Sequence, residues 1–200
     1  MSRTLTLLSL ILIIISLAIC GTAYTRWSEM IKIKGKVKMG DLCVRIGSCK
    51  VLVENKSREE AQLAYGNPVK IWIEGSEEGG VWVGLVIAND GSIPAYIRYD
   101  IDLPKGFLYE TYFYGPYKRG IPHKVWAFWD GSVVEGYSNE PPNLNKGYKF
   151  VAWYHITWNQ YINGTQQYES KIVYRTWFTL WSMTNKVLLY FKLTGNHTEG

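Results

Sequence analysis

The sequence predicts an all-β fold, an antiparallel β-sandwich of the jelly-roll type. Residues that favour strands are abundant, with 9 Trp, 15 Tyr and 6 Phe among 200 residues, and runs of helix-forming residues are nearly absent. About nine or ten short segments alternate between apolar and polar residues, with turn residues between them. The length suits one domain, and a hydrophobic content of 47% suffices for a sizeable core.

The N-terminus is predicted to be a cleaved signal peptide. Arg3 precedes an uncharged apolar run, residues 5–19, and small residues follow before Tyr24. We place cleavage between Ala23 and Tyr24, which predicts a secreted protein that meets the membrane only through its signal peptide. An uncleaved anchor is the alternative, although the run is shorter than the roughly 20 residues that span a bilayer.

The segment after the signal peptide alternates over residues 24–42. Its apolar positions include Ile31, Ile33 and Val37, and four lysines occupy the other face. Cleavage would lower the net charge by one from the +5 of the whole chain. Lysines spread along one strand do not form the clustered basic patch of a nucleic-acid site, so no nucleic-acid partner is predicted.

Residues 41–46 and 49–55 are predicted to form a hairpin around Gly47-Ser48. Cys43 and Cys49 flank that turn, and in a secreted chain this placement favours a local disulfide. Two buried thiols are the alternative.

The rest of the chain follows the same pattern with few interruptions. Residues 57–68 are the only predicted helical turn, and residues 81–89 are apolar on both faces, which is typical of a central strand in a covered sheet. The other expected elements are strands at 69–75 and 93–103, a loop or hairpin at 105–122, two short strands around Asp130-Gly131, a loop at 139–147, and strands at 148–162, 174–184 and 186–194.

Three sequons predict an extracellular surface that can carry glycans; they begin at Asn55, Asn163 and Asn196.

No catalytic motif is present in the sequence. The histidines, at 123, 155 and 197, have no Glu or Cys at metal-ligand spacing. Asp100 and Asp102 lie on one face of a strand, for which a solvated face is a simpler account than a calcium or catalytic pair. We therefore predict neither catalysis nor a metal or cofactor.

The tryptophans permit a sugar-stacking platform, but aromatic residues at alternate strand positions more often pack a core. The set comprises Trp72, Trp82, Trp126, Trp129, Trp153, Trp158, Trp177 and Trp181.

Residues 27–44, "WSEMIKIKGKVKMGDLCV", resemble the mature N-terminus of the TasA/camelysin group of exported filament proteins and their archaeal relatives, the bundling pilins. The matching positions are Trp27, Ser28, Glu29, Ile31, Ile33, Gly35, Val37, Gly40 and Leu42. Residues 85–97, which contain Asn-Asp-Gly-Ser, are similar to a second motif of the group, and residues 144–156 more weakly to a third. Arg26 departs from the small or acidic residues of the group.

The resemblance implies a subunit of an extracellular filament, such as a pilus or biofilm-matrix fibre at the cell surface. Residues 24–35 would be a donor strand that completes the sheet of the next subunit, and residues 36–200 the jelly-roll domain. Trp27, Ile31, Ile33 and Val37 would fill the acceptor, with Gly35 and Gly40 as hinges. The partners would be identical subunits joined head to tail, with filament bundling and surface polysaccharide as further contacts.

Three other interpretations stay open at this stage. Residues 24–39 could form an ordinary first strand of their own domain. The protein could be a monomeric secreted β-sandwich that binds carbohydrate through exposed Trp and Tyr. A surface enzyme would require Asp100 and Asp102 to line a cleft.

Overall fold

The computed structural model describes residues 40–54, 60–64, 66, 68–127 and 133–195. The predictions for the signal peptide, its cleavage between Ala23 and Tyr24, the donor strand and the Gly35 hinge lie outside these residues, as do the sequons at Asn55 and Asn196.

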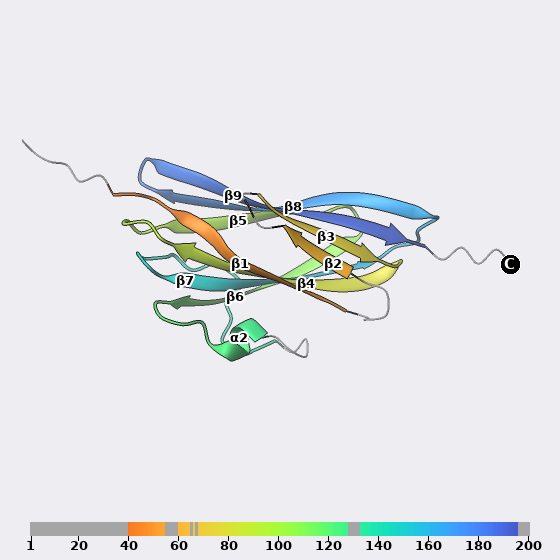
Figure 1. Ribbon diagram of the computed structural model, residues 1–200, viewed down its shortest axis with the longest axis horizontal. Coiled ribbons are helices and arrows are strands. Elements are labelled where there is room, and N and C mark those ends of the chain that lie inside the picture. Colours follow the sequence, from red (N-terminus) through yellow and green to blue (C-terminus); the bar gives the residue numbers. More distant parts are fainter. Residues whose placement is uncertain (1–39, 55–59, 65, 67, 128–132, 196–200) are drawn as a thin grey trace, which may run out of the picture. The chain divides into compact units, whose positions relative to one another are not determined.

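Two β-sheets pack face to face and form a β-sandwich, which confirms the predicted fold class (Figure 1). The four-stranded sheet has the order β1-β4-β7-β6 and the five-stranded sheet the order β2-β3-β9-β8-β5. The strands are β1 (Val44–Val53), β2 (Glu60–Ala64), β3 (Val69–Gly75), β4 (Glu78–Asn89), β5 (Tyr96–Asp102), β6 (Phe107–Tyr117), β7 (Lys149–Asn159), β8 (Thr165–Phe178) and β9 (Trp181–Thr194). Neighbouring strands are antiparallel, except that β3 and β9 run parallel.

The core lies between the inner faces of the two sheets. In β3 every second residue is buried, namely Val69, Ile71 and Ile73, and the residues between them are exposed. This period of two places one face of each strand in the core. Burying such a side chain contributes roughly 1.5–3 kcal/mol.

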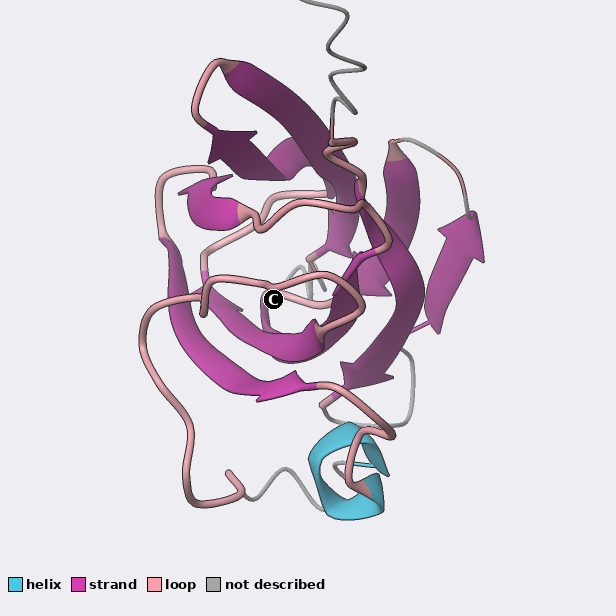
Figure 2. Cartoon of the chain, turned by 90° about the vertical axis from the view of Figure 1, so that its left-hand side faces the viewer, coloured by secondary structure: helices cyan, strands magenta, loops and turns pink. Residues whose placement is uncertain are grey.

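The outer face of the four-stranded sheet is covered as well. The short helix α2 (His123–Ala127) lies against this face (Figure 2). Trp153 Nε1 donates a 2.9 Å hydrogen bond to the Val125 carbonyl, and the Tyr114 hydroxyl donates a 2.8 Å bond to the Val134 carbonyl. This cover explains why β4 is apolar on both faces, as predicted for residues 81–89.

The predicted hairpin at Gly47-Ser48 is wrong. Residues 44–53 form one strand whose register shifts by one residue between Ile46 and Ser48, so the glycine marks a β-bulge. The chain from Cys43 to Cys49 is therefore extended and rises roughly 3.3 Å per residue. This places the two thiols too far apart for a disulfide. No disulfide joins them, which corrects the predicted bond.

Other elements differ from prediction for local reasons. Glu60–Ala64, expected to be helical, is strand β2, because it pairs with β3. The expected loop or hairpin at 105–122 contains the single strand β6, and the expected strand before Asp130 is α2. The last hairpin turns at Thr179, whose φ is 51°, rather than at Asn185. Asn185 instead lies buried and donates a 2.8 Å hydrogen bond to the Val44 carbonyl.

In the described part of the chain, no helix has the length and apolar character needed to cross a membrane.

Candidate functional site

The core is only partly covered at the side of the sandwich where the edge strands β5 and β6 meet. Tyr99 of β5 packs on Phe113 of β6 at 5.1 Å between ring centroids, and its hydroxyl lies 3.2 Å from Thr111 Oγ1. Tyr109 lies on the same inward face of β6 as Phe107 and Phe113. These two residues are buried, yet Tyr109 is 46% exposed. On β5 the inward residues Tyr99 and Ile101 are only half-buried. Apolar side chains that point between the sheets thus remain accessible along this side of the domain.

These two strands also have unpaired backbone edges among the described residues. β5 pairs with β8 on one side, and on the other side the only backbone pairing among the described residues is an isolated bridge between Ala95, just before the strand, and Leu144. β6 pairs with β7, and its other side has an isolated bridge between Phe113 and Ser138. The N–H and C=O groups that point outward from an edge strand can pair with an added strand.

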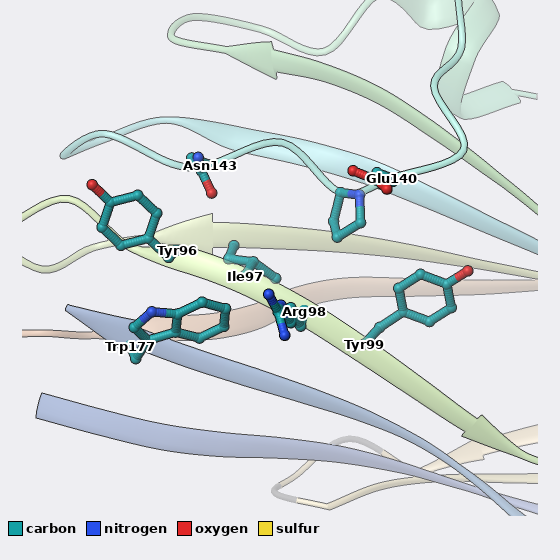
Figure 3. Close-up of a pocket in the computed structure, with 8 residues that line it drawn as sticks. Tyr96, Ile97, Arg98, Tyr99, Glu140, Asn143 and Trp177 are labelled. Carbon is teal, nitrogen blue, oxygen red and sulfur yellow. The ribbon is translucent and has the colours of Figure 1, made fainter. Parts of the chain in front are cut away.

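A groove of about 490 Å³ runs along β5 and is bounded on its other side by the loop before β7 (Figure 3). Tyr96 and Trp177 form one end, with ring centroids 6.1 Å apart, and the Arg98 guanidinium lies 5.5 Å from the Trp177 ring. The lining residues are Tyr96, Ile97, Arg98, Tyr99, Glu140, Pro141, Asn143 and Trp177.

The outward face of β5 carries paired charges. Asp100 lies 3.1 Å from Arg175, and Asp102 lies 3.0 Å from Lys171. Both carboxylates are largely exposed, and neither lines the groove. This placement agrees with the predicted solvated face.

The chain enters the described domain through contacts with the turn that follows β4. The Asp41 N–H donates to Ser92 Oγ over 2.7 Å, and the Ser92 N–H donates to the Asp41 carbonyl over 2.8 Å. The Cys43 carbonyl accepts from the N–H groups of Asp90 and Gly91. We call the contacts between residues 40–43 and 90–93 the entry clamp.

The entry clamp depends on a close backbone approach at Gly91. A Cβ atom at this position would lie 2.6 Å from the Cys43 nitrogen and would also clash with the Asp41 carbonyl oxygen. Gly40, predicted as a hinge, packs against Ile93 in the same region, because an added Cβ would overlap the Ile93 side chain. Backbone segments this close leave no room for a side chain.

Asn89 joins the entry clamp to the groove. Its buried side-chain amide donates to the carbonyls of Ile93 and Leu144, at 2.9 and 3.0 Å, and its Oδ1 accepts from the Gly91 N–H. Leu144 in turn forms the bridge to Ala95, the residue just before β5. The Asn-Asp-Gly-Ser motif therefore fixes both the entry of the N-terminal segment and the near end of the groove.

Sequence reasoning missed a polar cluster on the outer face of the four-stranded sheet. His155 Nε2 lies 3.0 Å from Glu54, and its Nδ1 lies 3.9 Å from Glu110. The His155 ring stacks on Trp82 at 4.1 Å, and Trp82 Nε1 donates a 2.7 Å hydrogen bond to Glu54. Alternation could have placed each residue outward, but only the strand order brings them together. Within the described ranges, no group of three or more acidic, His or Cys residues could hold a metal ion.

The remaining predicted site residues fall at separate places. Asn163 is exposed in the turn between β7 and β8, where a glycan would meet solvent. The tryptophans divide by burial: Trp82, Trp153 and Trp158 are buried, Trp126 and Trp177 are partly covered, and Trp72 and Trp181 are exposed. Trp129 lies outside the described residues.

No family model matches the chain, and no curated protein matches it. Two solved structures match part of the chain at low similarity. One is a family 123 glycoside hydrolase from Clostridium perfringens, with 12% identity and a TM-score of 0.40; the match covers 74% of this chain and 28% of the hydrolase. The other is the GAE domain of GGA2p from Saccharomyces cerevisiae, with 10% identity and a TM-score of 0.30, covering 76% of this chain and 96% of that domain. At these scores neither likeness informs function.

Proposed function

We propose that this protein is a non-catalytic structural subunit of an extracellular filament. The N-terminal strand of one subunit adds to the β5 edge of the next, which makes a head-to-tail homopolymer. The observation that carries the proposal is the partly covered side of the sandwich, where Ile101 and Tyr109 point inward but stay partly accessible and β5 has an unpaired strand edge.

The donor segment has the pattern that such an edge requires. Residues 27–39 alternate, so Ile31 and Ile33 can cover the accessible core side chains while the backbone pairs with β5. Twelve residues span roughly 40 Å at about 3.3 Å per residue, more than the length of β5. Insertion into a different copy is a heterologous contact, which grows a filament and not a closed dimer.

Charge adds little to the same pairing. The lysines of the donor segment would lie on the outer face of the extended sheet, next to Asp100 and Asp102, whose carboxylates already pair with Arg175 and Lys171. Because these groups are exposed and share their partners, we expect salt to change assembly only slightly.

The test compares the chain lacking its first 23 residues with a chain that starts at Gly35, by negative-stain electron microscopy and sedimentation. We expect filaments from the first and monomers from the second. A peptide of residues 24–39 should raise the melting temperature of the shorter chain, because it fills the vacant edge in trans.

A substitution in the acceptor is the second arm. Ile101→Lys places a charge on the inward face of β5, and we expect it to leave the monomer folded and to abolish filaments. Leu180→Lys is the matched control, because Leu180 is 98% exposed in the β8–β9 turn. Filaments from the chain that starts at Gly35, or from Ile101→Lys, would contradict the proposal. Folded monomers from the longer chain would favour an N-terminal strand that pairs within its own domain.

A further inference from the structure

A second aromatic site lies on the outer face of the five-stranded sheet, away from the β5 edge. Trp72 on β3 is 40% exposed, and Tyr190 is its direct partner on β9. Their ring centroids are 5.5 Å apart and their planes differ by 18°. Of the candidate tryptophans that the structure describes, Trp72 is the exposed one with a parallel aromatic neighbour and a flanking groove.

The groove beside these rings holds about 280 Å³, close to the lower end, roughly 300 Å³, of the range for ligand sites. Its polar side chains include both hydrogen-bond donors and hydrogen-bond acceptors. Glu74 and Lys192 form a 3.0 Å ion pair, and the Gln167 amide offers both a donor and an acceptor. Two ring faces are thus bordered by hydrogen-bonding groups within one small groove.

The position in the sheet restricts what can bind. Trp72 pairs with Gln62 on one side and Tyr190 on the other, and Tyr190 pairs in turn with Glu169. Because the backbone is paired on both sides, a peptide strand cannot add here, and recognition depends on side chains alone. The paired charges of Glu74 and Lys192 cancel, so the groove does not select a charged ligand.

We propose that this groove binds a neutral polysaccharide. A sugar ring has an apolar C–H face, which covers an aromatic ring, and hydroxyl groups at its rim, which exchange hydrogen bonds with amide, carboxylate and ammonium groups. Trp72 and Tyr190 supply the stacking surface, and Gln167, Glu74 and Lys192 supply the polar contacts. This binding goes beyond filament assembly and does not depend on it, since the site and the β5 edge share no lining residue.

The experiment measures retention of the chain lacking its first 23 residues on beads that carry covalently coupled xylan, β-1,3-glucan or mannan, against uncoupled beads. We expect retention on at least one polysaccharide. Trp72→Ala should weaken binding at least tenfold, and Gln167→Ala should weaken it several-fold. Trp181→Ala is the matched control, because Trp181 is 51% exposed but does not line the groove.

The proposal is overturned if no coupled polysaccharide retains the wild-type chain, or if Trp181→Ala weakens retention as much as Trp72→Ala does. Circular dichroism of each variant shows whether it is folded, and Gln167→Ala, an exposed polar change, keeps the test valid if Trp72→Ala unfolds. The retention measurement is separate from filament formation. Loss of retention with normal filaments would place the failure in the groove at Trp72, and loss of filaments with normal retention would place it at the β5 edge.

Discussion

The backbone N–H of Asp41 donates a hydrogen bond to Ser92 Oγ, and the Ser92 N–H returns one to the Asp41 carbonyl. This reciprocal pair fixes the chain at the point where the N-terminal segment joins the domain. A force that pulls on the N-terminal segment would therefore act first on the turn after β4. It would then act on Asn89, which is hydrogen-bonded to that turn.

Asn89→Ala should lower the free energy of unfolding by about 2–4 kcal/mol, because it leaves buried partners at Ile93, Leu144 and Gly91 without their hydrogen bonds. Urea denaturation of the chain that starts at Gly35 measures the change. Asn143→Ala is the control, since Asn143 is exposed on the neighbouring loop. A loss below about 0.5 kcal/mol, the range of ordinary surface changes, would show that Asn89 does not organise the turn.

Gly91→Ala should destabilise the entry clamp by about 1–3 kcal/mol, because the added methyl group meets backbone atoms of Asp41 and Cys43 that cannot rotate away. Gly120→Ala is the matched control, with nothing within 4 Å of its added Cβ. Thermal unfolding of both variants reports the difference. Equal melting temperatures would mean that residues 40–43 are not held by the turn.

Tyr154 and Tyr174 form a buried pair, with hydroxyl oxygens 2.5 Å apart. Either single change to Phe leaves one buried hydroxyl without this partner and should cost about 1–3 kcal/mol. The double variant removes both hydroxyls, so it should recover much of the loss. Urea denaturation of the four proteins completes a double-mutant cycle, and additive losses would exclude coupling between the two hydroxyls.

Stability should fall at alkaline pH partly through Cys49. Burial raises the pKa of its thiol from 9.0 to about 12. Between these values the unfolded chain loses this proton while the folded chain keeps it, so stability is full below pH 9 and decreases as pH rises, by up to about 1.4 kcal/mol per pH unit. Cys49→Ala should reduce the slope of unfolding free energy against pH in that window. An unchanged slope would show that the thiol ionises equally in both states.

The sequence predicted what alternation alone determines. The strand character of β3, β5 and β7, and the double cover of β4, follow from which side chains must avoid water. The bulge at Gly47 was misinterpreted as a turn, because a glycine next to a serine is compatible with both. Residues 123–127 form a helix that covers the outer face of the four-stranded sheet. A local sequence pattern does not reveal that this face is covered.

The candidate sites required knowledge of strand order. The edge position of β5, the contact of His155 with two glutamates, and the adjacency of Trp72 and Tyr190 each depend on pairing between distant segments. By contrast, the stretch at Asn89–Ser92 stood out in the sequence through its resemblance to a filament-protein motif, although its contacts with residues 40–43 appear only in the structure.

The parallel pairing of β3 with β9 sets a condition on the timing of folding. β3 reaches its partner only after the chain has been made as far as Thr194, and β9 also separates β3 from β8. The five-stranded sheet therefore cannot be completed before β9 has been synthesised, and pairing over such a sequence distance is slow. Until β9 has been made, β3 has β2 as its strand partner among the described strands, and its other edge stays without a neighbour.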